Sequence, residues 1–214
     1  MGIFDLFSNE TKQRDKLLRK YSSEQLADTI ASLYRHCFHC VIHHPLDNDV
    51  SNQIENMILQ VKNQYGTGLE ATKKLCDFAV ECKRSGRLKE AIEFYRQASE
   101  LMPTRSMTYY SLAKSLYLLN CLEEAISAYK LAYIYTERVT SDLFRHAGHA
   151  LYDAGREDTP TAIEYRKSIA GQHNIVIGGQ QYYSQKIGND ANDYKYIKLG
   201  MDVLKDLRIL VFYK

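Results

Sequence analysis

Apolar residues recur along this chain at the spacing of α-helices. In the middle of the chain they fall three or four residues apart, which places their side chains on one face of a helix. The same spacing occurs earlier, from Leu26 to Val41 and from Ile54 to Val61, and returns between Tyr194 and Val211. Pro45 and Gly66 end the first two of these segments. The pattern predicts an all-α protein.

The central part of this pattern occurs more than once, at a fixed interval that we call the repeat period. The segment KEAIEFYRQASEL starts at Lys89, and EEAISAYKLAYIY starts at Glu123, so the repeat period is 34 residues (123 − 89). Ala91 recurs as Ala125 and Ala98 as Ala132. A third, less regular copy begins with Leu143 and contains an insertion before the helix expected from 159. A fixed period with small residues at fixed places is typical of stacked helix pairs.

These residues resemble the tetratricopeptide repeat family, in which each repeat is a pair of antiparallel helices of about 34 residues. The first copy, about 72–105, matches the family at Leu75, Phe78, Ala79, Gly86, Ala91, Tyr95, Ala98 and Pro103. The second, about 106–139, has Asn120 at the turn and Glu137 in place of the proline. The resemblance implies a right-handed α-solenoid of antiparallel helix pairs. Because a single repeat cannot bury its apolar face, helical caps are expected at both ends.

Three regions follow from this organisation. Residues 1–66 are predicted to form an N-terminal helical hairpin that caps the array. Residues 67–170 hold two clear repeats and one degenerate repeat. Residues 171–214 contain an irregular segment and then a C-terminal capping helix. The fold of 171–189 stays open, because its glycines fit neither a strand nor a helix well.

The first helix of each repeat lines the concave face in the family that this chain resembles. The predicted partner-binding residues on that face are Lys73, Asp77, Arg84, Tyr110, Lys114, Tyr117, Arg145 and Tyr152. Cations outnumber the single carboxylate in this set, so the expected ligand is an acidic segment or a free C-terminal carboxylate. The alternative is a solvated helical face with scattered lysines.

Composition narrows the function classes. The net charge of +2 is too small to indicate nucleic-acid binding. No stretch of the chain has the length and apolarity of a membrane span or the layout of a secretory signal. The five cysteines are an odd number spread over predicted helices, which favours reduced thiols and a cytoplasmic location. We find no nucleophile elbow, helical metalloprotease pair or phosphate loop, so no enzyme is predicted.

Histidines and cysteines cluster between residues 36 and 44. On a helix, His36, Cys40 and His43 share a face, and their side chains are of the types that bind zinc. Structural zinc usually draws ligands from two segments, however, and no second cluster follows at a usual distance. We therefore favour a structural role for these residues, keep the three as weak metal candidates and predict no cofactor.

The sequence favours a protein-protein interaction adaptor that binds a protein or peptide segment in the basic, tyrosine-bearing groove. One alternative is a dedicated chaperone or structural subunit of a larger complex. An alternative of another class is a metal or redox protein centred on the histidines and cysteines. The pattern leaves open whether the groove or the C-terminal helix binds the partner, and which oligomeric state the chain adopts.

Overall fold

The computed structural model describes residues 3–39, 45–154, 176–177, 180–181 and 192–208. This part of the chain is helical apart from one pair of two-residue strands. The helices are α1 (Ile3–Leu18), α2 (Ser23–Cys37), α4 (Asn48–Tyr65), α5 (Leu69–Arg84), α6 (Leu88–Leu101), α7 (Ser106–Leu118), α8 (Leu122–Tyr135), α9 (Ser141–Ala154) and α11 (Asn192–Lys205). The strands β1 (Val176–Ile177) and β2 (Gln180–Gln181) pair antiparallel. No helix in the described ranges is both long and apolar enough to cross a membrane.

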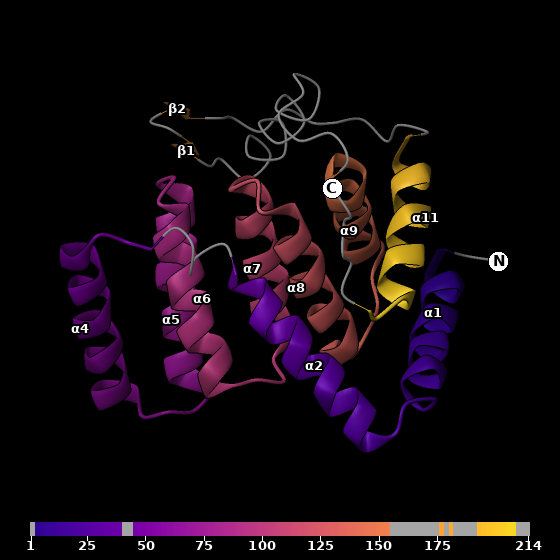
Figure 1. Cartoon of the computed structure of the whole chain (residues 1–214), viewed down its shortest axis with the longest axis horizontal. Coiled ribbons are helices and arrows are strands. Elements are labelled where there is room, and N and C mark those ends of the chain that lie inside the picture. Colours follow the sequence, from indigo (N-terminus) through magenta and orange to yellow (C-terminus); the bar gives the residue numbers. More distant parts are fainter. Residues whose placement is uncertain (1–2, 40–44, 155–175, 178–179, 182–191, 209–214) are drawn as a thin grey trace.

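Sequential antiparallel helix pairs form the body of the molecule (Figure 1). Helix α5 pairs with α6 and α7 pairs with α8, while α6 also packs on α7 and α8 on α9. The small residues of the repeat are buried in the core of the helix row. Ala91, Ala98 and Ala125 are fully buried, and Ala132 is 1% exposed. These repeat positions therefore belong to the core and not to an exposed face.

The repeat period is also visible in the turns. Helices α6 and α8 have the same length, and both their first and last residues lie one repeat period apart. Before each of them, Gly86 and Asn120 adopt positive φ angles of 76° and 67°. The amide of Arg87 donates to Cys82 O and that of Cys121 to Leu116 O, both at 2.9 Å. These are matching Schellman caps, in which a left-handed residue closes the helix. Asparagine tolerates this conformation better than most residues, so Asn120 replaces the glycine.

The N-terminal helices differ from the predicted hairpin. Helix α2 begins with the expected capping box, in which Ser22 and Gln25 cap each other. It then lies obliquely across α8, whereas α4 packs on α5 and α6 (Figure 1). The hydroxyls of Tyr34 and Ser99 are 3.3 Å apart, which also joins α2 to α6. The apolar stripe of α2 therefore packs on α6 and α8, which are the second helices of the two pairs, and not on α4.

Helices α1 and α11 lie side by side at the end of the helix row opposite α4 (Figure 1). Buried Arg14 of α1 donates to Tyr133 O and Thr136 O, which are carbonyls at the end of α8. The Oε2 atom of Glu10 on α1 lies 3.2 Å from Nζ of Lys205 on α11. Helix α11 itself packs closely on α9, so both terminal helices contribute to the same end of the molecule.

The contact between α9 and α11 depends on two glycines. A Cβ added to Gly148 would overlap the backbone of Tyr196, and a Cβ added to Gly200 would overlap the backbone of Phe144. Both glycines therefore allow the helix backbones to touch. The expected C-terminal helix is thus present and covers one face of α9. The helix expected from 159 lies outside the described residues.

Candidate functional site

The predicted groove residues on α5 are exposed. Lys73, Asp77 and Arg84 all lie on the solvent-facing side of this helix. Lys73 Nζ is 2.8 Å from the carboxylate of Glu70, an exposed pair of the (i, i+3) kind. Such a pair stabilises a helix only slightly and does not hold the lysine in one place. These three side chains are accessible, but little in the structure positions them.

Tyr110 and Lys114 on α7 are positioned much more firmly. Both are half-buried, and Lys114 Nζ lies 4.9 Å from the centroid of the Tyr110 ring. That ring meets Tyr129 and His146 edge to face, with centroids 6.0 and 5.9 Å away. The ring is therefore fixed by α8 and α9, and in turn it supports the ammonium group.

Three cations on alternate helices form what we call the basic cluster. It consists of Lys83 on α5, Lys114 on α7 and Arg145 on α9. Burial lowers the pKa of Lys114 to about 8, and the positive charges of Lys83 and Arg145 act in the same direction. Burial also lowers the pKa of Lys83. The protein therefore holds cationic groups together where their charge is disfavoured.

Counter-charge in the basic cluster is limited. Arg145 pairs with Asp142 at 2.8 Å, and Asp142 is the carboxylate that favours the charged form of Lys114. Asp142 is itself exposed and already engaged by Arg145. Within the part of the chain that the structure describes, neither Lys83 nor Lys114 makes a salt bridge. An anion that reached the basic cluster would supply the missing charge.

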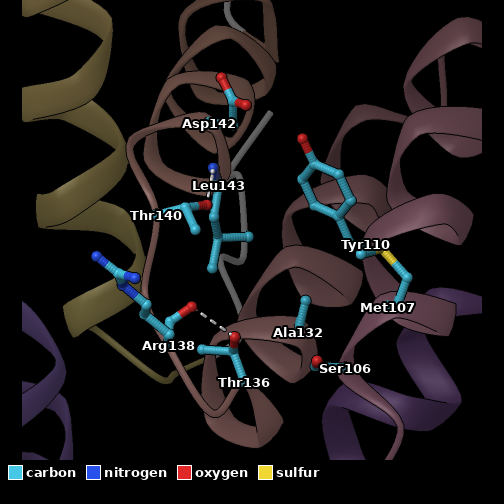
Figure 2. Close-up of a pocket in the computed structure, with 9 residues that line it drawn as sticks. All are labelled: Ser106, Met107, Tyr110, Ala132, Thr136, Arg138, Thr140, Asp142 and Leu143. Carbon is cyan, nitrogen blue, oxygen red and sulfur yellow. Dashed lines mark hydrogen bonds between the residues drawn. The ribbon is translucent and has the colours of Figure 1, made fainter. Parts of the chain in front are cut away.

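A pocket of about 310 Å³ opens at one end of Tyr110 (Figure 2). It lies between the starts of α7 and α9 and the end of α8. Its lining residues are Ser106, Met107, Tyr110, Ala132, Thr136, Arg138, Thr140, Asp142 and Leu143. Hydroxyl groups and one arginine alternate there with apolar side chains, as in sites that bind a peptide side chain or chain end. The pocket shares Tyr110 and Asp142 with the surroundings of Lys114.

A larger hollow of about 640 Å³ lies elsewhere, along the turns at 45–50, 86–90 and 118–120. None of the predicted groove residues lines it. Its walls come from three separate turns and include Leu46, Leu118 and Leu119. Size alone therefore does not select the site, and the charge and rigidity around Lys114 favour the smaller pocket.

Two of the predicted groove tyrosines make contacts with other side chains of this chain. Tyr117 is 2% exposed, and its hydroxyl donates to the Asp153 carboxylate. Tyr152 packs edge to face on Tyr196 of α11, with ring centroids 5.4 Å apart. Helical spacing placed both tyrosines on the groove-facing stripe, but it contains no information about α11. Tyr117 is therefore buried, whereas Tyr152 is half-buried and packs against α11.

One residue of the basic cluster was not predicted. Lys83 lies three residues after Val80 on α5 and Arg84 lies four residues after it, so both spacings fit the same helical face. Sequence reasoning selected Arg84. Lys83 is half-buried and its charge contributes to the lowered pKa of Lys114, whereas Arg84 is exposed.

The candidate metal ligands are only partly described. His36 is half-buried, and its Nδ1 is 2.8 Å from the Ser127 hydroxyl oxygen. Burial lowers its pKa, whereas Glu124 acts in the opposite direction. Cys40 and His43 lie outside the described residues. In the described ranges, no group of three or more histidine, cysteine or acidic side chains is placed to hold a metal.

Comparisons with family models, with curated proteins and with solved structures each found no significant match to this chain.

Proposed function

We propose that this chain is an interaction protein that binds an acidic protein segment, or a C-terminal carboxylate, at the basic cluster and the adjacent pocket. The observation that carries the proposal is Lys114, a half-buried ammonium group held on the Tyr110 ring between two other cations. A cation kept in this position without a salt bridge destabilises the free protein. Binding of an anion would offset that cost.

We further propose that the helix pairs form a right-handed solenoid of the tetratricopeptide type with helical caps. The support is the shared repeat register of α6 and α8 and the matching caps at Gly86 and Asn120. In such an array the first helices, α5, α7 and α9, lie next to one another. A ligand that runs across them would meet Lys83, Lys114 and Arg145 in turn.

The ligand's chemistry follows from the groups available. Lysine and arginine side chains bind carboxylates by charge-assisted hydrogen bonds, which are stronger than neutral ones. The pocket beside them is lined by hydroxyl groups and by apolar side chains, among them buried Leu143 and exposed Met107. A peptide with a carboxylate next to a medium-sized apolar side chain would use both parts of the site.

A displayed library of random peptides, with free and with amidated C-termini, tests this proposal. The wild-type chain is expected to enrich sequences rich in Asp and Glu, or those with a free terminus. The double variant Lys114→Glu, Arg145→Glu should lose at least about tenfold in affinity for the selected peptides, because it reverses two charges of the site. Lys12→Glu, at an exposed position on α1, is the matched control and should bind like the wild type. Equal enrichment by the double variant would contradict the assignment of the site.

A structural subunit of a larger complex is the second candidate. It is favoured by large apolar side chains that remain exposed near the start of the helix row, where Leu59 is 56% and Leu69 is 45% exposed. A stable contact at this end would cover them without involving the basic cluster. Size-exclusion chromatography with light scattering distinguishes the two roles, since a strict monomer at every concentration would argue against the subunit role.

A further inference from the structure

Helix α4 continues the register of the repeat. Its buried residues Ile54, Ile58 and Val61 stand one repeat period before Leu88, Ile92 and Tyr95 of α6. All six side chains are at most 6% exposed. Because the same positions are buried at the same interval, α4 occupies the place of the second helix in a pair. It packs on α5 as α6 packs on α7.

The first helix of that pair is not supplied by the preceding helix. Helix α6 pairs with α5, where the Phe94 and Phe78 rings are 5.7 Å apart. Helix α8 pairs in the same way with α7. Helix α2, which precedes α4, packs on α8 instead, and α4 forms the outer end of the helix row (Figure 1). Among the described helices, none therefore packs on the side of α4 that corresponds to the side of α6 on which α5 packs.

The exposed side of α4 can be identified by comparison with α6. Ala91, Phe94 and Ala98 of α6 are at most 1% exposed. Their counterparts one repeat period earlier are Met57, Gln60 and Gln64. Met57 is half-buried, and the two glutamines are exposed. With Gln53 one turn earlier, they make a continuous stripe that we call the α4 seam: Gln53, Met57, Gln60 and Gln64.

The α4 seam carries no charge. Four of the exposed residues beside it are also uncharged: Asn52, Asn56, Leu59 and Asn63. The exposed charged residues of α4 are Asp49, one turn before Gln53 at the start of the helix, and Glu55, on the side away from the seam. By contrast, the exposed side of α5 carries five charged residues: Glu70, Lys73, Asp77, Glu81 and Arg84. Loss of charged residues from an exposed helix face is the compositional mark of a protein interface.

We infer that a second copy of this chain packs its α4 antiparallel against the α4 seam. The orientation follows from the fold, because a helix that takes the place of α5 on α6 runs antiparallel to its neighbour. The identity of the occupant follows from the chemistry. A twofold axis brings like side chains together, and glutamine tolerates this because its amide both donates and accepts hydrogen bonds. Charged side chains in the same places would repel their copies.

The register of the dimer follows from the spacing of the seam. A twofold axis between Met57 and Gln60 places Gln53 opposite Gln64 of the second copy. It also places Met57 opposite Gln60 of the second copy. The contact involves one helix from each chain, so it is smaller than a standard interface, and a dissociation constant of about 10 to 100 μM is expected. The basic cluster lies on α5, α7 and α9 and stays free in this dimer.

Sedimentation velocity of the full chain over a concentration series tests the dimer and its register. The wild type should be a reversible dimer at high concentration. The variant Gln53→Glu, Gln64→Glu places like charges opposite each other twice and should raise the dissociation constant at least about tenfold at low salt. The variant Gln53→Lys, Gln64→Glu places opposite charges there and should associate at least as well as the wild type. In a parallel dimer both variants would be weakened.

Controls keep the result tied to the α4 seam. The variant Ala27→Glu, Ala31→Glu adds the same charge to an exposed face of α2 and should associate like the wild type. Circular dichroism should show unchanged helix content, because every substituted position is exposed. A wild type that stays monomeric at all concentrations overturns the inference. So does a dimer that the like-charge variant leaves intact, or one that both seam variants weaken equally.

Discussion

Replacing Lys114 by methionine should stabilise the free protein while abolishing anion binding. Methionine keeps the apolar stem of lysine and removes the charge. Burial and the neighbouring cations lower the pKa of this lysine from 10.5 to about 8, so the folded protein disfavours the charged form. A difference of that size corresponds to about 3 kcal/mol at most. Because the ammonium is partly exposed, solvent screening reduces this to about 1–2 kcal/mol.

One favourable interaction is lost in the same substitution. The ammonium lies over the Tyr110 ring at 4.9 Å, and a contact of this kind contributes about 0.5–1 kcal/mol. The net effect of Lys114→Met at pH 7 is therefore an increase of about 1 kcal/mol in the free energy of unfolding. Lys73→Met, at an exposed position on α5, should change it by less than about 0.5 kcal/mol.

The pH dependence separates this explanation from a simple gain in packing. Between about pH 8 and 10.5 the unfolded chain binds the proton of Lys114 more strongly than the folded chain does. The stability of the wild type should therefore rise over this range relative to the variant, and the difference between them should shrink. Urea unfolding of both proteins at pH 7 and at pH 10 measures this difference in the free energy of unfolding. A variant that is less stable than the wild type at pH 7, or a difference that does not change with pH, would refute the reasoning.

Two further predictions concern the contact between α9 and α11. Gly148→Ala should lower the free energy of unfolding by about 2–3 kcal/mol in urea titrations, because its Cβ would overlap the backbone of Tyr196, whereas Gly68→Ala, with open space around it, should be nearly neutral. Burial lowers the pKa of His149 to about 3, so the unfolded chain binds its proton more strongly between about pH 3 and 6.5 and stability should fall as the pH decreases through that range. At pH 5 this residue lowers the free energy of unfolding by about 2 kcal/mol. Unfolding titrations of His149→Gln should therefore show a stability that falls less steeply below pH 6.5 than that of the wild type. An unchanged pH dependence would mean that other groups cause the loss of stability in acid.

Local sequence determined the helices and turns of the sequential helix pairs. Helix stripes, small residues and turn residues act over a few positions. The recurrence of Ala91 as Ala125 follows from spacing, and the resemblance to tetratricopeptide repeats marks Gly86 as a turn residue. The substitution of Asn120 for glycine did not disturb the turn, because asparagine also adopts the left-handed conformation. The pairing of α5 with α6 and of α7 with α8 follows directly from short connections between helices.

Tertiary structure decided which faces remain available. The apolar stripe of α2 predicts that one side of this helix is buried, but it does not identify the helix that packs there. In the structure α8 packs on this side, whereas α4 was expected. Tyr117 and Tyr152 share the helical spacing of Tyr110, yet Asp153 and α11 engage the first two. Lys83 joins Lys114 only because α5 and α7 lie together. Periodicity specifies the direction of a side chain relative to its own helix, whereas long-range packing determines what that side chain meets.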